Sequence, residues 1–151
     1  MITKLKVVTA LLMTVVLYTP ANAQDNKRNY EQGTVWTTGY IETKPGYFNA
    51  YMNNLEEQWL QFIKLQQKDG DVLSYKVLNV ISPRDGEPDL ILLVEWKNMA
   101  VFDRSAKYFE DLTKKVAGTL DKQVERNIDR EELRKLRGGQ IARELIFQVD
   151  Q

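Results

Sequence analysis

The sequence of 151 residues contains no cysteine and no histidine. Without cysteine there is no disulfide, no lipid-attachment site and no thiolate for catalysis or metal binding, so packing alone must stabilise the fold. Without histidine the chain lacks the commonest acid/base group near neutral pH and the commonest transition-metal ligand. These absences exclude haem on an axial histidine, ordinary zinc sites and Ser-His-Asp catalysis, and we predict no metal and no cofactor.

The chain also lacks an excess of charge, with 21 basic and 21 acidic side chains. Nucleic-acid-binding domains typically carry a basic excess, so we predict no nucleic-acid partner. The sequence has no phosphate loop, dinucleotide fingerprint, calcium loop or H-E-x-x-H motif. No short motif therefore assigns a reaction.

The amino terminus has the order of a secretory signal peptide: Lys4 and Lys6, an apolar run over 7–18, Pro20, and Ala21-Asn22-Ala23. A membrane-spanning helix needs about 20 apolar residues, whereas this run is shorter and is broken by threonines. We therefore expect residues 1–23 to be cleaved after Ala23. The mature protein would be periplasmic or secreted, with no stable membrane anchor.

Cleavage there leaves 128 of the 151 residues, a length that fits one domain and is too short for two. Residues 24–32 are polar and aperiodic, so we predict a flexible leader. We expect residues 33–151 to form a single domain.

The first half of this domain alternates between strand and helix patterns. β-branched and aromatic residues predict a strand over Thr34–Thr43, closed by a turn at Lys44-Pro45-Gly46. Apolar residues at three- and four-residue spacings predict an amphipathic helix over 48–66. Strand patterns over 71–82 and 90–96, joined by a polar loop, predict an antiparallel hairpin.

The residue pattern of the second half predicts helices followed by a strand. Asn98 can cap a helix that runs to Ala117-Gly118. A charged helical stretch with a capping box at Asp129 and Glu132 follows. We expect its apolar residues to point inward: Leu120, Val124, Ile128, Leu133 and Leu136. After Gly138-Gly139, alternation predicts a last strand over Ile141–Val149.

The resulting order, β-α-β-β-α-β, predicts an α+β ferredoxin-like fold, a four-stranded antiparallel sheet with its helices on one face. The five apolar residues of Leu90–Val94 place aliphatic side chains on both faces of that strand. The helices can cover only one face, so the other should expose an apolar patch. We expect a second copy of the chain to cover this patch. The residues predicted to form the patch are Leu73, Tyr75, Val77, Ile91, Leu93, Leu145 and Phe147.

Three runs of sequence carry a family resemblance. They are Lys44-Pro45-Gly46-x-Phe48-x-x-Tyr51, Lys68-Asp69-Gly70 before Val72-Leu73-Ser74-Tyr75, and Asp89-Leu90-Ile91-Leu92 running into Glu95-Trp96-Lys97-Asn98-Met99-Ala100. Over most of residues 34–149 the chain resembles dimeric α/β-barrel proteins, ferredoxin-like proteins whose two sheets close into a barrel across a two-fold axis. More narrowly it is similar to exported bacterial proteins of that superfamily without an established activity. These share a run like Asp129-Arg130-x-x-Leu133-Arg134 before Gly138-Gly139.

The resemblance implies a fold and a homodimer but no single function. Members of the superfamily include monooxygenases, isomerases and ligand-binding stress proteins, so the fold does not select among them. The catalytic histidine of several of these enzymes has no counterpart in this chain.

Four aromatic residues are candidates for ligand binding: Trp59, Tyr75, Trp96 and Tyr108. Together they could line a cleft between helices and sheet, where their rings would hold a flat apolar ligand. Aromatic residues at these spacings are also ordinary core residues, and the sequence leaves both interpretations open.

Two charged features are weaker candidates. Glu95 lies within an apolar strand, where a buried carboxylate would have a raised pKa suited to general acid/base catalysis. It can equally lie at the solvent-exposed end of the strand, as an exposed or salt-bridged carboxylate. Arg126, Arg130, Arg134 and Arg137 align on one helical face that could hold a carboxylate or phosphate ligand. Interleaved acidic residues favour an ion-pair network instead.

These observations favour a homodimeric binding module that encloses a small apolar or aromatic ligand, with Trp59, Tyr75, Trp96, Tyr108 and Arg130 as its binding residues. The alternative is a cofactor-free monooxygenase or isomerase acting on a small carbonyl or aromatic substrate, with Glu95 as the catalytic candidate. The lack of histidine and cysteine inclines the prediction away from an enzyme.

Overall fold

A computed structural model describes residues 28–148 of the chain; the predicted signal peptide and the predicted end of the last strand at Val149 lie outside these residues. Four strands form one sheet: β1 (Tyr30–Thr43), β2 (Val72–Asn79), β3 (Leu90–Trp96) and β4 (Arg134–Phe147). The helices are α1 (Phe48–Asn54), α2 (Leu60–Lys68), α3 (Ala106–Ala117) and α4 (Leu120–Glu131). A π-helical turn, η1 (Leu55–Trp59), joins α1 to α2, and a 3-10 turn, η2 (Met99–Asp103), precedes α3.

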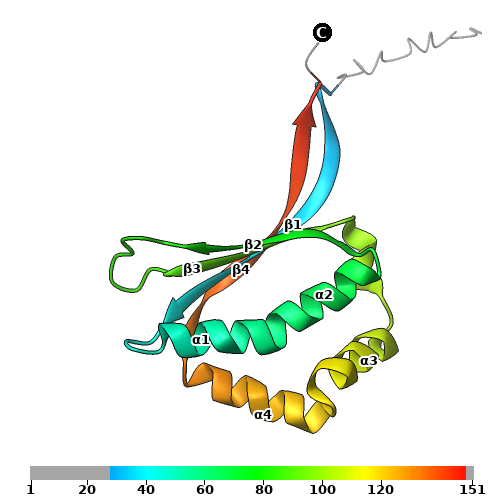
Figure 1. Cartoon of the computed structure of the whole chain (residues 1–151). Coiled ribbons are helices and arrows are strands. Elements are labelled where there is room, and N and C mark those ends of the chain that lie inside the picture. Colours follow the sequence, from blue (N-terminus) through cyan, green and yellow to red (C-terminus); the bar gives the residue numbers. More distant parts are fainter. Residues whose placement is uncertain (1–27, 149–151) are drawn as a thin grey trace, which may run out of the picture.

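The sheet is antiparallel throughout, with strand order β2-β3-β1-β4, and all helices lie on one side of it (Figure 1). This order, together with the succession of strands and helices, is that of the ferredoxin-like fold and confirms the predicted α+β class. The two hairpin strands β2 and β3 lie together on one half of the sheet. The terminal strands β1 and β4 lie on the other half.

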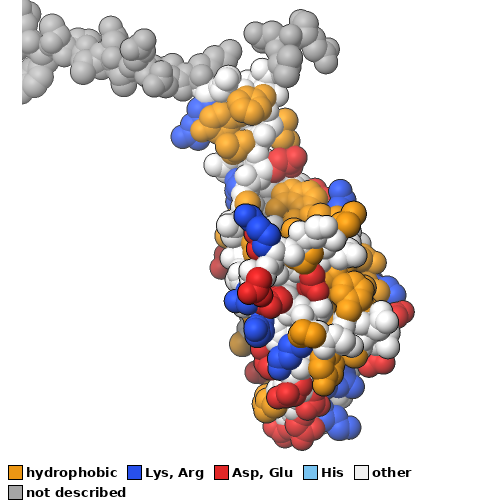
Figure 2. All heavy atoms as spheres, turned by 90° about the vertical axis from the view of Figure 1, so that its left-hand side faces the viewer, with side chains coloured by type: hydrophobic (Ala, Val, Ile, Leu, Met, Phe, Trp, Pro, Cys, Tyr) orange, Lys and Arg blue, Asp and Glu red, His pale blue; other side chains and the backbone are white. Residues whose placement is uncertain are grey.

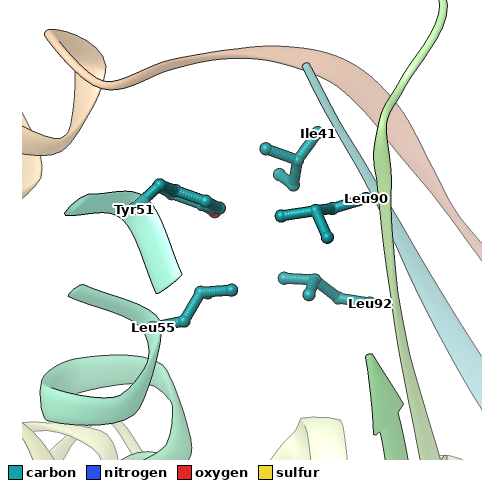
Figure 3. Close-up of a cluster of buried hydrophobic side chains, with 5 residues drawn as sticks. All are labelled: Ile41, Tyr51, Leu55, Leu90 and Leu92. Atoms are coloured by element: carbon teal, nitrogen blue, oxygen red, sulfur yellow. The ribbon is translucent and has the colours of Figure 1, made fainter. Parts of the chain in front are cut away.

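The main core lies between the sheet and the continuous helix α1–η1–α2. Ile41 of β1 and Leu90 and Leu92 of β3 point toward Tyr51 and Leu55 of the helix (Figure 3). These five side chains are at most 8% exposed. The spacing of Tyr51 and Leu55 places them on one helical face, and the alternation of Leu90 and Leu92 places them on one face of β3.

Helices α3 and α4 form an outer layer, on the far side of the α1–α2 helix from the sheet (Figure 1). Ser105 and Thr119 cap the two helices, because their hydroxyls accept from the amides of Tyr108 and Lys122. Gly118, at φ +85°, makes the turn between them. The capping box predicted at Asp129 and Glu132 was wrong, since α4 begins after Thr119 and has Glu132 at its end.

The predicted inward face of α4 was also wrong. Leu120, Val124 and Ile128 are 42%, 57% and 64% exposed, whereas Arg126 and Arg130 are partly buried. The α1–α2 helix already occupies the face of the sheet, so α4 contacts chiefly α3 and β4. Leu133 does reach the main core, but Leu136 is exposed.

The terminal strands are longer than predicted and extend beyond the sheet as a two-stranded arm (Figure 1). β1 begins at Tyr30, inside the segment we expected to be a flexible leader, and Tyr30 pairs with Phe147. Hydrophobic side chains cover the end of this arm (Figure 2), where Leu145, Ile146 and Phe147 are at least half exposed.

No helix within residues 28–148 combines the length and the apolar character needed to cross a bilayer.

Candidate ligand-binding site

A groove of about 280 Å³ lies between the α1–η1–α2 helix and β2. Its walls are mainly apolar, and the lining residues are Met52, Asn53, Leu55, Glu56, Trp59, Leu60, Tyr75 and Val77. Trp59 and Tyr75 meet edge to face, with ring centroids 5.7 Å apart and planes at 85°. We call this cavity the Trp59–Tyr75 groove.

The π-helical turn η1 shapes one wall of this groove. Three of its residues, Leu55, Glu56 and Trp59, line the cavity. A π-helical turn holds an extra residue relative to an α-helix, and such turns occur frequently at functional sites. Here it lets Leu55 reach the main core while Trp59 packs against both hydrophobic clusters and the groove. The sequence pattern carried no signal for this turn.

The other two predicted aromatic residues lie outside the groove. Trp96 packs beneath it in a second cluster with Ile63 and Val94, 5.2 Å from the ring of Phe102, and its indole nitrogen donates to Thr37 Oγ1 at 2.8 Å. Its hydrogen bond and packing are those of a core residue. The structure therefore brings together two of the four predicted aromatic residues.

Tyr108 belongs to a separate polar cluster around the buried carboxylate of Asp71. The Tyr108 hydroxyl lies 3.0 Å from Asp69 Oδ2 and 3.2 Å from Asp71 Oδ2. Arg104 forms an ion pair with Asp71 at 2.5 Å and stacks over the Tyr108 ring at 4.9 Å. The Asp71 carbonyl also accepts from the amide of Lys97. This cluster connects the turn after α2 to the end of β3 and to α3. Its role is therefore structural.

Stability at alkaline pH is expected to depend on Tyr108. Burial, and then the hydrogen bond and charge of Asp69, raise the pKa of Tyr108 above 10.0. The resulting stability is fully present below the unfolded pKa of about 10 and is lost as pH rises through the raised folded pKa. Above about pH 10, the free energy of unfolding of Tyr108→Phe should therefore fall less steeply than that of the unaltered protein. Urea titrations at stepped pH measure this, and parallel slopes would contradict it.

Glu95 lies on the opposite face of the sheet from the groove. Its carboxylate accepts from Thr34 Oγ1 at 3.0 Å and from Ser74 Oγ at 2.6 Å. The Thr34 hydroxyl also lies 3.0 Å from Glu144 Oε2. Because Val94 and Trp96 face the helices, strand alternation directs Glu95 to the open face. Glu95 is therefore half-buried in a polar cluster and does not face Trp59 or Tyr75.

The four arginines predicted as one stripe share no partner with one another. Arg126 donates to the Val116 carbonyl at 3.2 Å and Arg130 to Gln58 Oε1 at 2.6 Å. Arg134 bonds the Tyr51 hydroxyl and pairs with Glu131, and Arg137 pairs with Glu42. Only the last two form ion pairs among the described residues. The predicted ion-pair network thus accounts for half of the stripe.

Burial shifts the pKa of one of these arginines, Arg130, and of Tyr51, which is a partner of Arg134. Arg130 is partly buried, and desolvation, followed by the charge of Arg134, lowers its pKa. Tyr51 is fully buried, which raises its pKa although Arg134 opposes the shift. The Nε atoms of Arg130 and Arg134 are buried without a hydrogen-bond partner.

The open face of the sheet, opposite the helices, carries a different apolar set from the one predicted. Tyr75 and Val77 were assigned to this face wrongly, because both point toward the helices. Ile91 and Leu93 do lie on it, and the pairing register adds Trp36, Tyr40 and Leu78. Strand alternation relative to Ile41 could have identified Trp36 and Tyr40, whereas the face of Leu78 follows from its pairing with Ile91.

Comparison with known proteins gives distant structural likenesses only. No protein-family model matches the chain, and no curated protein matches it significantly. A dimeric ferredoxin-like protein from an uncultured marine organism has a TM-score of 0.49 at 9% identity, covering 80% of this chain and 91% of the other. A conserved protein from Methanosarcina mazei Go1 has a TM-score of 0.44 at 16% identity, covering 74% and 91%.

A protein from Shewanella oneidensis has a TM-score of 0.46 at 15% identity, covering 78% of this chain and 96% of the other. The strand order and pairing of this chain are therefore the basis for its fold assignment. Within residues 28–148, no group of three or more acidic side chains is arranged to hold a metal ion.

Proposed function

We propose that the mature protein is an exported homodimer that binds a small apolar or aromatic ligand in the Trp59–Tyr75 groove. The observation that carries this proposal is the groove itself, an apolar cavity with two aromatic rings in its wall. Export is supported by the signal-peptide pattern of residues 1–23.

The size and lining of the groove define the class of ligand. Ligand pockets generally measure about 300–1,000 Å³, so a groove of about 280 Å³ suits a molecule of one or two rings. Met52, Leu60 and Val77 provide apolar contact, and Asn53 and Glu56 provide polar groups. We therefore expect a flat apolar ligand that carries a single hydrogen-bonding group.

The open face of the sheet supports the homodimer. Leu78 is 43% exposed there, beside the partly exposed Trp36, Tyr40, Ile91 and Leu93. The same face carries charges of both signs, including Lys76 and Glu95, so two copies can approach without general repulsion. A second copy packed sheet to sheet would remove this apolar surface from water.

The geometry favours binding over catalysis. The alternative enzyme would need Glu95 to face the bound substrate, but Glu95 lies on the other side of the sheet from the groove. Its hydrogen bonds to Thr34 and Ser74 are those of a carboxylate that anchors neighbouring strands.

Binding of aromatic probes tests this function. We expect indole and 2-naphthol to bind the protein, as detected by saturation-transfer NMR, and Trp59→Ala to weaken binding at least about tenfold, or 1.4 kcal/mol. Tyr47→Ala is the matched control, because Tyr47 is an exposed aromatic residue that does not line the groove. Absence of binding by a broad panel of apolar and aromatic fragments, or equal binding by Trp59→Ala, would refute the proposal.

A further inference from the structure

A second cavity lies on another side of the same helix, in the seam between α2 and α3. It measures about 420 Å³ and is lined by Gln61, Lys64, Leu65, Lys68, Lys115 and Val116. Three of these six residues are lysines, and none is acidic. The cavity shares no lining residue with the Trp59–Tyr75 groove.

More positive charge surrounds this cavity. Arg126 of α4 donates to the carbonyl of Val116, a lining residue, at 3.2 Å. One turn further along α4, Arg130 reaches Gln58 of the helix that forms the other wall. None of the ion pairs among residues 28–148 involves Lys64, Lys68, Lys115, Arg126 or Arg130.

This arrangement places like charges close together; the acidic side chain within electrostatic reach of Lys115 is Asp111. Lys64 and Lys68 are four residues apart on α2, and like charges at that spacing destabilise a helix. The helix dipole accounts for a cation in the last turn of α2 and of α3, where Lys68 and Lys115 lie. It does not account for Lys64, or for three lysines around one cavity.

We propose that this seam binds a small organic anion with two or more phosphate or carboxylate groups. Lys64, Lys68 and Lys115 hold the anionic oxygens, and Arg126 adds a long-range attraction from α4. Leu65 and Val116 provide an apolar floor for the carbon skeleton of the ligand. The volume lies within the range of small-molecule sites, which supports a molecule larger than a single inorganic ion.

Calorimetric titration with pyrophosphate and with citrate tests the proposal on the full mature protein. We expect both probes to bind with dissociation constants of about 1 mM or lower, and binding to weaken as ionic strength rises. Tighter binding of pyrophosphate assigns the site to phosphorylated compounds, and tighter binding of citrate assigns it to polycarboxylates. No binding of either probe at about 1 mM overturns the proposal.

A charge-matched pair of double variants locates the site. Lys64→Gln with Lys68→Gln should weaken binding at least about tenfold. Lys97→Gln with Lys122→Gln removes the same charge at exposed lysines outside the cavity and should change binding less than about twofold. Glutamine has a helix propensity close to that of lysine, so α2 should persist in the variant. Equal losses in both double variants would show general charge attraction and overturn the proposal.

The anion site is independent of the aromatic groove. Trp59→Ala should bind pyrophosphate and citrate as the unaltered protein does. Loss of anion binding in Trp59→Ala, with the fold preserved by circular dichroism, would contradict a separate site in the seam.

Discussion

Shortening Leu90 to alanine is expected to lower the free energy of unfolding by about 2–5 kcal/mol. Leu90 is 1% exposed and faces the main core, where Ile41, Tyr51 and Leu55 surround it (Figure 3). These neighbours belong to the sheet and to α1–η1, so they cannot collapse into the cavity without moving one layer against the other. Such a loss is a large fraction of the about 5–15 kcal/mol that stabilises a typical domain.

Urea denaturation at a fixed protein concentration measures the effect. Ile81→Ala provides the control, because Ile81 is an apolar residue that is 92% exposed after the end of β2. The control should change the free energy of unfolding by less than about 0.5 kcal/mol. Similar losses in Leu90→Ala and Ile81→Ala would mean that Leu90 does not lie at the centre of the core.

The sheet and its helix were predictable because short-range patterns decide them. The apolar run of β3 and the three- and four-residue spacing in α1–α2 are local features of the sequence, so each element could be recognised by itself. The turn at Lys44-Pro45-Gly46 also followed from local chemistry, since Gly46 has φ +83°. The ferredoxin-like order followed from these elements.

The orientation of α4 was not predictable in the same way. Its apolar residues are regularly spaced, so the pattern correctly indicated an amphipathic helix. Amphipathicity does not say what covers the apolar face, and within residues 28–148 nothing buries Leu120, Val124 or Ile128. The error came from the assumption that every helix packs its apolar side on its own sheet.

The candidate site was predictable in part. Trp59 and Tyr75 lie together because one comes from the helix and the other from the helix-facing side of β2, although the sequence pattern had also placed Tyr75 in the open-face set. Trp96 also faces the helices, from β3, but the Phe102 ring packs against it, so Trp96 is a core residue and does not line the groove. Tyr108 lies beyond the sheet on α3, and only tertiary packing could place it beside Asp71.

The arm formed by β1 and β4 adds a reason to expect a second copy. A two-stranded ribbon alone is marginally stable in water. In this arm Leu145, Ile146 and Phe147 are 50%, 51% and 65% exposed, and the Tyr30 and Phe147 rings touch only at its end. Cover from a partner chain would stabilise both the arm and the open face, with which the arm is continuous.

We expect Leu93→Lys to convert the proposed homodimer into a monomer. Leu93 lies on the open face in the middle of β3, paired with Thr38 of β1 and Lys76 of β2. A lysine there would place a second ammonium beside Lys76, and its counterpart in the partner would meet the same charge across the two-fold axis. Burying an unpaired charge costs far more free energy than the contact of one leucine contributes.

Multi-angle light scattering over a range of protein concentrations measures the mass directly. A stable interface buries about 800 Å² per partner, so the unaltered protein should remain dimeric at low micromolar concentration. Ile81→Lys is the matched control, because it introduces the same charge at a position outside the strands and should leave the dimer intact. A monomeric unaltered protein at high micromolar concentration contradicts the dimer itself. A Leu93→Lys protein that stays dimeric instead places the interface elsewhere, with the apolar residues of the arm and of α4 as the remaining exposed surfaces.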